Sequence, residues 1–151
     1  MQYSDELNGK VAFVTGGSNG IGAATVRSLA NAGAQVAIGY HSSLERAEIL
    51  RRELPGSGHS IIRLSLDDVS SIRNAASELQ ANHGRLDALV NSAGFTKPIP
   101  HQDIAALDDE LFGDILMANA RGPYSVIRAV MPLLKASDDA VVVSVSSISA
   151  R

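Results

Sequence analysis

Short β-branched runs alternate along this chain with longer stretches whose apolar residues recur at helical spacing. The runs that predict strands are residues 11–15, 35–40, 60–65, 88–91 and 140–145. Between them, apolar residues at i, i+3, i+4 and i+7 predict helices with one buried face. Two such stripes are Val69, Ile72, Ala76, Leu79 and Val126, Ile127, Val130, Leu134. This alternation predicts an α/β fold, a doubly wound parallel sheet with helices on both faces.

Residues typical of helix ends support these boundaries. Gly33 and Gly84 stand where a left-handed residue would end the preceding helix. Asp68 and Asp108 stand where a side-chain oxygen would cap the first turn of the next helix. The second stripe, starting at Val126, is expected to face either the core or a subunit interface.

The first predicted strand runs into a glycine turn and then into a helix. Residues 15–22, here called the glycine turn, read Thr-Gly-Gly-Ser-Asn-Gly-Ile-Gly. Glycines let the backbone approach phosphate oxygens, and the unpaired N–H groups of a first helical turn attract an anion. No Lys-Ser or Lys-Thr pair follows the last glycine, which excludes a phosphate loop of the ATPase type. The glycine turn therefore predicts a nucleotide site at the edge where parallel strands end.

Composition narrows the class of protein. The 151 residues suit one domain, residues 1–151. Lys and Arg number 13 against 16 Asp and Glu, and this net charge of −3 argues against nucleic-acid binding, which needs dense positive charge. Cysteine is absent, and His59, His83 and His101 are expected at the surface or at caps, so no metal site is expected.

No segment of the sequence favours a membrane or an export route. Even the longest purely apolar stretches, such as residues 140–143, are far shorter than the roughly 20 residues of a membrane span. Residues 1–10 are polar and lack the apolar centre of a signal peptide. The expectation is therefore a cytoplasmic protein without a membrane partner.

A second motif, considered together with the glycine turn, indicates a protein family. Residues 91–94, at the end of the fourth predicted strand, read Asn-Ser-Ala-Gly. With both motifs in order and strand and helix units between them, the chain resembles the short-chain dehydrogenase/reductase family over its whole length. Residues 85–87, 119–122 and 146–147 add further agreement. The resemblance implies a Rossmann fold and hydride transfer between a nicotinamide cofactor and a small-molecule alcohol or ketone.

The resemblance also assigns roles to residues of this chain. Backbone groups of the glycine turn would hold the pyrophosphate, and Ser147 would hydrogen-bond the substrate oxygen. Asn119 would bend its helix and hold a water in the proton-delivery chain. The implied cofactor-binding residues are Gly16, Ser18, Asn19, Gly20, Ile21, Gly22, Tyr40, His41, Ser42, Ser43, Ser65, Leu66, Asn91, Ala93 and Gly94, and the implied catalytic residues are Ser147 and Asn119.

Two of these positions depart from the family pattern. Ser65 stands where an aspartate commonly contacts the adenine, with Leu66 supplying a backbone N–H. Asp67 and Asp68 are expected to lie too far along to replace that aspartate unless the loop slips. Asn91 would tie the central strands together through its amide. Ser92 replaces a second asparagine and is expected to cost little.

The end of the second predicted strand bears on the choice of cofactor. An NAD site usually has a carboxylate there to accept from the ribose 2′-hydroxyl, yet residues 39–43 read Gly-Tyr-His-Ser-Ser. The hydroxyls of Ser42 and Ser43 and the imidazole of His41 are able to bond a 2′-phosphate. NADP(H) is therefore favoured and NAD(H) stays open, as does the alternative that the two serines only cap the next helix.

The family's Tyr-x-x-x-Lys motif is not found in these 151 residues, which end four positions after Ser147. The expectation is the cofactor-binding portion of a longer enzyme, homo-oligomeric at full length and inactive as this chain alone. The alternative is a non-catalytic dinucleotide-binding sensor or scaffold. Without a following strand, the last predicted strand is expected to expose an apolar edge and make the chain poorly soluble.

Overall fold

Five parallel strands form one sheet in the computed structural model, which describes residues 6–147. The strands are β1 (Val11–Thr15), β2 (Gln35–Tyr40), β3 (Ser60–Arg63), β4 (Ala88–Asn91) and β5 (Val141–Ser144). Their order across the sheet is β3-β2-β1-β4-β5, and every neighbouring pair is parallel. The chain thus builds outward in one direction from β1 and then crosses back to β4. The predicted doubly wound sheet is confirmed.

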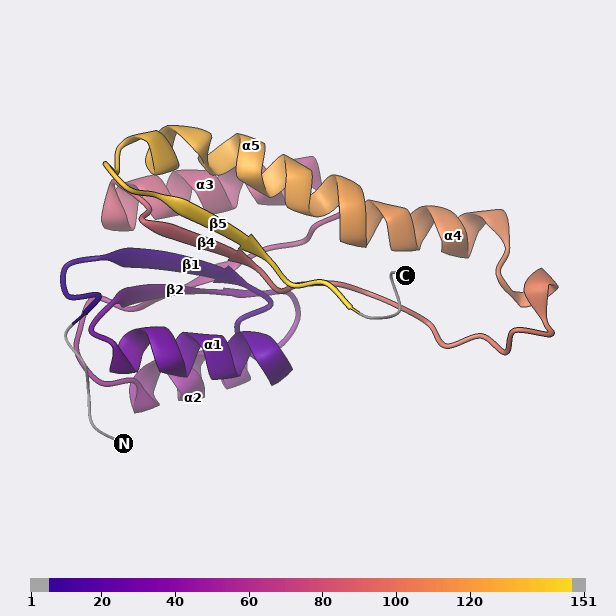
Figure 1. The fold of residues 1–151 in the computed structure, drawn as a ribbon, viewed down its shortest axis with the longest axis horizontal. Helices are drawn as coiled ribbons and strands as arrows, with labels where there is room; N and C mark the ends of the chain where they lie inside the picture. The colour runs from indigo at the N-terminus through magenta and orange to yellow at the C-terminus, as the bar shows by residue number, and fades with distance from the viewer. Residues whose placement is uncertain (1–5, 148–151) are drawn as a thin grey trace.

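Helices cover both faces of this sheet, as predicted (Figure 1). The α-helices are α1 (Gly20–Asn31), α2 (Leu44–Glu53), α3 (Val69–His83), α4 (Asp109–Leu116) and α5 (Gly122–Lys135). A 3₁₀ turn, η1 (Ile104–Ala106), precedes α4, and a π-helical segment, η2 (Met117–Arg121), joins α4 to α5. In Figure 1, α1 and α2 lie on one face and α3 and α5 on the other, while α4 continues past the end of the sheet.

The alternation of side chains along the strands divides the core into two layers. Phe13 of β1 and Leu89 of β4 belong to the cluster that α3 and α5 cover. Their neighbours Val14 and Val90 point to the opposite face and belong to the cluster under α1 and α2. This is the period of two that a strand buried on both faces requires.

The second helical stripe is core. Val126, Val130 and Leu134 are buried in the layer between α5, α3 and the sheet, and Ile127 packs against it. The alternative of a subunit interface for this stripe is therefore wrong. The side of α5 that carries Tyr124 and Met131 is exposed instead.

The predicted helix ends are confirmed. Gly33 follows α1 with φ of 95°, and Gly84 ends α3 with φ of 74°. The carboxylate of Asp68 accepts from the Ser70 N–H at 2.7 Å, and that of Asp108 accepts from the Leu111 N–H at 2.8 Å. Local chemistry therefore fixes where these helices begin and stop.

The third strand is shorter than the predicted 60–65. The Leu64 N–H still donates to the Tyr40 carbonyl at 2.7 Å, as a strand residue would. The next N–H, that of Ser65, donates at 2.9 Å to the hydroxyl of Ser71 on α3. The chain leaves the sheet at this point because a helix hydroxyl takes the place of the strand acceptor.

Two of the histidines expected at the surface or at caps are half-buried, and one of them, His83, lies in the last turn of α3. His59 is half-buried, accepts from the Val36 N–H at 3.1 Å through Nδ1, and lies 2.8 Å from the Pro55 carbonyl through Nε2. His83 is also half-buried, and its Nε2 lies 2.8 Å from the hydroxyl of Ser60. Both rings therefore tie the start of β3 to its neighbours, whereas His101 is exposed as expected.

The last strand exposes the apolar edge that the sequence predicts. β5 pairs with β4 on one side only, and residues 141–144 replace the predicted 140–145. The side chains of Val141, Val142 and Val143 are 50%, 44% and 50% exposed on this edge strand.

Candidate cofactor-binding site

The glycine turn connects β1 to α1 at the carboxyl edge of the sheet. Gly16 and Gly20 have φ of 64° and 50°, in the left-handed region that side chains disfavour. Asn19 precedes α1 without a capping hydrogen bond from its side chain, and the first turn of α1 holds no acidic residue. The first N–H groups of α1 therefore remain able to bind an anion.

Two close approaches explain the other glycine requirements of this turn. A Cβ at Gly22 would lie 2.2 Å from the carbonyl oxygen of Gly16, so Gly22 lets α1 start directly against the turn. A Cβ at Gly16 would lie 2.9 Å from the Cα of Ala93. A Cβ at Gly20 would meet nothing within 4 Å, so this glycine borders open space. The turn is thus a backbone-lined cradle, and it fits a dinucleotide pyrophosphate.

A threonine that the sequence analysis did not select joins the two motifs. The hydroxyl oxygen of Thr15, at the end of β1, accepts from the N–H groups of Ser92 and Ala93, each at 3.1 Å. Thr15 is buried, so these bonds are shielded from water. Its place at the end of a strand, directly before the glycines, was the available signal.

A cavity of about 410 Å³, here called the glycine-turn cavity, lies above these motifs. Its walls come from the glycine turn, the end of β2, the start of α2 and the loop after β4. They are lined by Gly16, Ser18, Asn19, Gly20, Ile21, Gly22, His41, Ser42, Ser43, Arg46, Ser92, Ala93, Gly94 and Val145. Eleven of the fifteen predicted cofactor-binding residues line this one cavity.

Arg46 is a cavity residue that sequence reasoning missed. Its guanidinium Nη2 donates to the hydroxyl of Ser43, one helical turn earlier. Ser43 occupies the N-cap position of α2, yet its side chain makes no capping hydrogen bond. A basic residue three positions after a serine at a predicted helix start was the signal that pointed to this pair.

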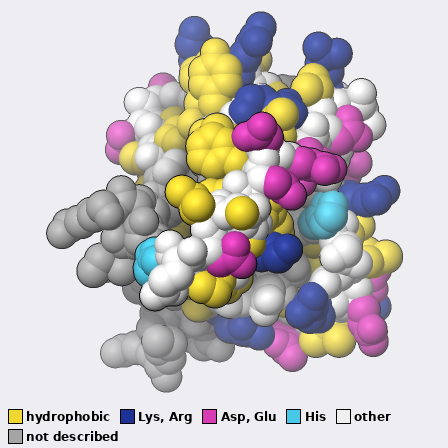
Figure 2. All heavy atoms as spheres, turned by 90° about the vertical axis from the view of Figure 1, so that its right-hand side faces the viewer, with side chains coloured by type: hydrophobic (Ala, Val, Ile, Leu, Met, Phe, Trp, Pro, Cys, Tyr) yellow, Lys and Arg dark blue, Asp and Glu magenta, His cyan; other side chains and the backbone are white. Residues whose placement is uncertain are grey.

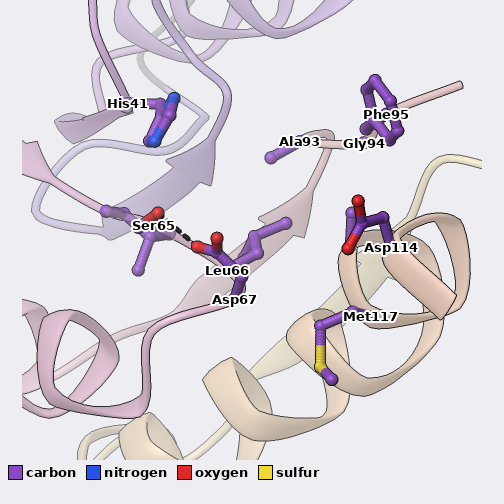
Figure 3. A pocket seen from close by; sticks show the side chains of 11 residues that line it. His41, Ser65, Leu66, Asp67, Ala93, Gly94, Phe95, Asp114 and Met117 are labelled. Atoms are coloured by element: carbon purple, nitrogen blue, oxygen red, sulfur yellow. Dashed lines mark hydrogen bonds between the residues drawn. The ribbon is translucent and has the colours of Figure 1, made fainter. Parts of the chain in front are cut away.

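A second cavity of about 420 Å³, here called the β3 cavity, adjoins the first and shares His41, Ala93 and Gly94 with it (Figure 3). Ser65, Leu66 and Asp67 form its wall after β3, and Asp114 and Met117 face them from α4 and η2. The two predicted residues after β3, Ser65 and Leu66, are thus brought to the same edge as the glycine turn.

Asp67, which the sequence predicts to lie too far along the loop unless the loop slips, lines the β3 cavity beside Ser65 and Leu66. Its carboxylate accepts a hydrogen bond from the hydroxyl of Ser65 and lines the β3 cavity (Figure 3). This hydrogen bond is the main reason that the pKa of Asp67 lies below its ordinary value. Because the chain leaves the sheet after Leu64, the loop turns back and places the Asp67 carboxylate beside Ser65 on the cavity wall.

Tyr40 and Asn91 line neither of these two cavities. Tyr40 packs partly against the core under α1 and α2. Asn91 is buried, and its amide Nδ2 donates to the hydroxyl of Ser144 on β5 at 3.5 Å. Its Oδ1 has no hydrogen-bond partner among the residues that the structure describes.

Asn119 fastens the loop after β4 to the helix above it. Its Oδ1 accepts from the Phe95 N–H at 3.0 Å, and its Nδ2 donates to the Phe95 carbonyl at 2.5 Å. A Cβ at Gly94 would lie 2.7 Å from that Oδ1. Asn119 sits inside the π-helical segment, where the backbone departs from α-helical geometry.

Ser147 is exposed and is the last residue that the structure describes. It follows Val145, which lines the glycine-turn cavity and donates its N–H to the Asn91 carbonyl at 2.9 Å. The chain therefore carries Ser147 from the end of β5, at the same edge of the sheet as the cofactor motifs.

Residues 6–147 hold neither a metal-binding cluster nor a membrane-spanning helix. No group of three or more His, Asp or Glu side chains there is arranged to hold a metal ion. None of the helices in that range has the length and apolar character needed to cross a membrane.

The sheet order and the glycine turn beside the crossover between β1 and β4 define a Rossmann-type domain. The sequence model described as short chain dehydrogenase matches residues 10–151. The chain belongs to this family of oxidoreductases, as the two motifs predicted.

Individual relatives agree with this assignment. A short chain dehydrogenase from Aspergillus terreus is 40% identical over 151 residues, covering 96% of this chain and 33% of that protein. The structure of a dehydrogenase/reductase from Sinorhizobium meliloti matches with a TM-score of 0.84 at 36% identity, covering 97% of this chain and 57% of that one. A short chain dehydrogenase from Burkholderia cenocepacia, solved in complex with NADP, gives 0.82 at 34% identity, covering 95% and 57%.

The share of each relative that is matched is also informative. The chain spans between 33% and 58% of the length of the curated relatives it matches. The five strands of this chain thus correspond to only part of the length of these relatives.

Proposed function

We propose that this chain is the cofactor-binding part of an NAD(P)(H)-dependent oxidoreductase that interconverts an alcohol and a ketone. The observation that carries the proposal is the pair of adjoining cavities at the carboxyl edge between β1 and β4, floored by the glycine turn and by residues 92–94. A bound nicotinamide supplies the hydride chemistry, and the protein holds and orients it.

Different residues of this chain bind different parts of the cofactor and the substrate. Free N–H groups at the start of α1 hold the pyrophosphate, and the small residues Ala93 and Gly94 let a ribose approach the backbone. Ser65, Leu66 and Asp67 border the place of the adenine. Ser147 donates to the substrate oxygen, where charge changes during hydride transfer.

NADP(H) is the favoured cofactor, with NAD(H) as the alternative. No carboxylate lines the glycine-turn cavity in the described part of the chain, so nothing there repels a 2′-phosphate or accepts from a 2′-hydroxyl as an acidic residue would. Hydroxyls of Ser42 and Ser43 and the imidazole of His41 line that cavity instead. The Burkholderia cenocepacia relative solved with NADP gives additional support.

Cofactor titration tests the proposal directly. We expect saturable binding of NADPH and NADH, followed by cofactor fluorescence, at concentrations below about 1 mM. The gene product extended beyond residue 151 is then supplied with a panel of carbonyl compounds, and oxidation of NADPH is followed. Binding without turnover, in a gene product that lacks Tyr-x-x-x-Lys, would favour the non-catalytic sensor or scaffold. Failure to bind either cofactor would refute both.

We further propose that the full-length protein is a homo-oligomer. Exposed apolar side chains gather on α4 and on the outer side of α5, and Figure 2 shows hydrophobic side chains in a band from the top to the centre of that end of the molecule. They include Phe112, Leu116, Tyr124 and Met131. Sedimentation of the full-length protein, compared with a Tyr124→Glu variant, tests whether this surface joins subunits.

A further inference from the structure

We propose that Arg121 is a positioning residue for the adenine end of the cofactor: its guanidinium holds the loop after β3, residues 65–68, in the shape that places the Asp67 carboxylate on the wall of the β3 cavity. This inference rests on the proposed function, because it presupposes that the adenine of a nicotinamide dinucleotide occupies that cavity. Arg121 lines neither of the two adjoining cavities, so it acts through residues that do.

The loop after β3 is anchored by a residue far away in the sequence. Arg121, the last residue of η2, donates from Nη2 to the Asp67 carbonyl at 2.8 Å. The two ends of the loop are held by α3 instead: the Ser65 N–H donates to the Ser71 hydroxyl at 2.9 Å, and the Asp68 carboxylate caps the first helical turn. Arg121 therefore ties the middle of the loop to the opposite side of the β3 cavity.

The residue after Arg121 shows how closely this side of the cavity packs against the loop. A Cβ at Gly122 would lie 2.7 Å from the Cβ of Leu66 and 3.1 Å from its carbonyl oxygen. Gly122 is buried, and Leu66 lines the β3 cavity. Residues 121 and 122 thus lie against residues 66 and 67, and this close packing places the Arg121 guanidinium within reach of the loop backbone.

The same guanidinium contacts the wall of the cavity that faces the loop. Its Nε donates to the Sδ of Met117 at 2.6 Å, and Met117 faces Leu66 and Asp67 across the β3 cavity (Figure 3). The donors of a guanidinium lie in one plane at fixed angles, so the bond to Met117 limits the directions in which Nη2 points. Arg121 therefore joins the two walls through one rigid group.

Arg121 binds the backbone of Asp67 and leaves its carboxylate available to a ligand. That carboxylate accepts from the Ser65 hydroxyl, the main cause of its lowered pKa, so it is ionised at neutral pH. An ionised carboxylate only accepts hydrogen bonds. It therefore favours adenine, which carries an exocyclic amino group, over hypoxanthine, which carries a carbonyl oxygen at the same position.

Loss of Arg121 is expected to release the loop and to reduce this selection. A loop that becomes ordered only when the ligand binds lowers affinity, because its ordering opposes binding. NADPH and NADH both carry adenine, so both should weaken together. The preference for adenine should also fall, because the Asp67 carboxylate is no longer fixed on the cavity wall.

The experiment compares Arg121→Gln and Arg121→Lys with Arg128→Gln in the gene product extended beyond residue 151. Arg128 is an exposed residue of α5 that lines neither cavity. Dissociation constants are measured by calorimetry for NADPH, NADH and the reduced nicotinamide hypoxanthine dinucleotide. Hydrogen exchange is followed in residues 65–68 and in the strands β1 and β2.

We expect Arg121→Gln to weaken NADPH and NADH alike, by about 5- to 20-fold, and to lower the preference for NADH over the hypoxanthine analogue by about fivefold. Exchange in residues 65–68 should become faster, and exchange in β1 and β2 should stay unchanged because the sheet remains folded. Arg121→Lys should show the same changes at smaller size, since an ammonium also donates to a carbonyl. Arg128→Gln should change none of these quantities.

The outcomes separate this inference from the proposed function. If the unsubstituted protein binds neither NADPH nor NADH, the proposed function fails and the inference fails with it. If it binds them, the inference alone fails when the unsubstituted protein does not prefer adenine, or when folded Arg121→Gln keeps that preference and the exchange rates of the loop. If Arg121→Gln does not fold, Arg121→Lys decides by the same two measurements.

Discussion

The junction between the two sequence motifs depends on one buried hydroxyl. Thr15 accepts from two backbone N–H groups that lie more than seventy positions later in the chain, at Ser92 and Ala93. Without that oxygen, both donors would be left in a site that Thr15 itself shields from water. A buried donor without a partner costs about 1–3 kcal/mol.

Replacing Thr15 by valine, which has nearly the same shape, tests this junction. We expect the free energy of unfolding to fall by about 1–3 kcal/mol and cofactor affinity to fall with it, because the loop at residues 92–94 loses its anchor. Thr15→Ser keeps the hydroxyl and should lose less on both counts. Urea unfolding and NADPH titration measure the two effects, and equal behaviour of the valine and serine variants would contradict the assigned role.

Asp87 provides a second residue-level prediction, at the opposite end of β4. Burial acts to raise the pKa of its carboxyl, but hydrogen bonds from the Val11 N–H and the Ser137 hydroxyl, with the charges of Arg85 and Lys10, bring the pKa below its ordinary value. Since the folded pKa is lower than the unfolded one, ionised Asp87 stabilises the fold above about pH 4 and loses this effect as the pH falls further.

The variant Asp87→Asn should therefore be less stable than the unsubstituted chain at pH 7, by about 1–3 kcal/mol. The difference should shrink as the pH is lowered from 5 toward 3, because protonation removes the same charge in the unsubstituted chain. Urea unfolding across this range measures it. A difference that stays constant down to pH 3 would show that the charge of Asp87 contributes nothing.

Among the elements, the π-helical segment η2 between α4 and α5 contacts the loops that follow β3 and β4 and lines the β3 cavity. It presents Asn119 to the backbone of Phe95 and places Met117 on the wall of the β3 cavity. Arg121, at its end, donates to the Asp67 carbonyl at 2.8 Å. One short irregular segment thus holds the loops that follow both β3 and β4.

Removal of the Asn119 amide should release the loop after β4. We expect Asn119→Ala to speed hydrogen exchange in residues 95–103 and to leave the strands β1 and β2 unchanged, because the loop loses both hydrogen bonds to Phe95. Asn74→Ala, on the exposed side of α3, is the matched control and should change neither region. Unaltered exchange at residue 95 would refute the anchoring role.

For the molecule as a whole, the edge of the sheet formed by β5 is the region where we expect self-association. Val141, Val142 and Val143 are about half exposed on a strand that pairs on one side only. Exposed apolar strand edges template association between chains. We therefore expect the 151-residue chain to self-associate at concentrations at which a longer product that covers β5 stays dispersed.

A single charge on this strand tests the cause. Val143→Lys should reduce light scattering of the 151-residue chain, because a lysine on an edge strand disfavours pairing with another edge. Gln80→Lys adds the same charge to an exposed position of α3 and should have a smaller effect. A monodisperse unsubstituted chain with a sharp, cooperative thermal transition would show that the exposed strand is tolerated.

Local patterns in the sequence carried most of the architecture. Short β-branched runs such as residues 11–15 predicted the strands, and Gly33 and Gly84 predicted the helix ends, which the structure confirms. Each of these features depends on a few neighbouring residues, so it can be predicted from the sequence without knowledge of the fold. The end of β3 was misjudged because its determinant, the hydroxyl of Ser71, lies outside the strand.

The amino-acid sequence by itself determined the parallel α/β class, the glycine turn and the family, since spacing and residue type along the chain suffice for each. Only the tertiary structure decided that Asp67 lies on the wall of the β3 cavity, that Thr15 binds the second motif and that Arg46 lines the glycine-turn cavity. The physical reason is distance along the chain: each of these properties depends on which distant groups approach a side chain, and folding alone brings those groups together.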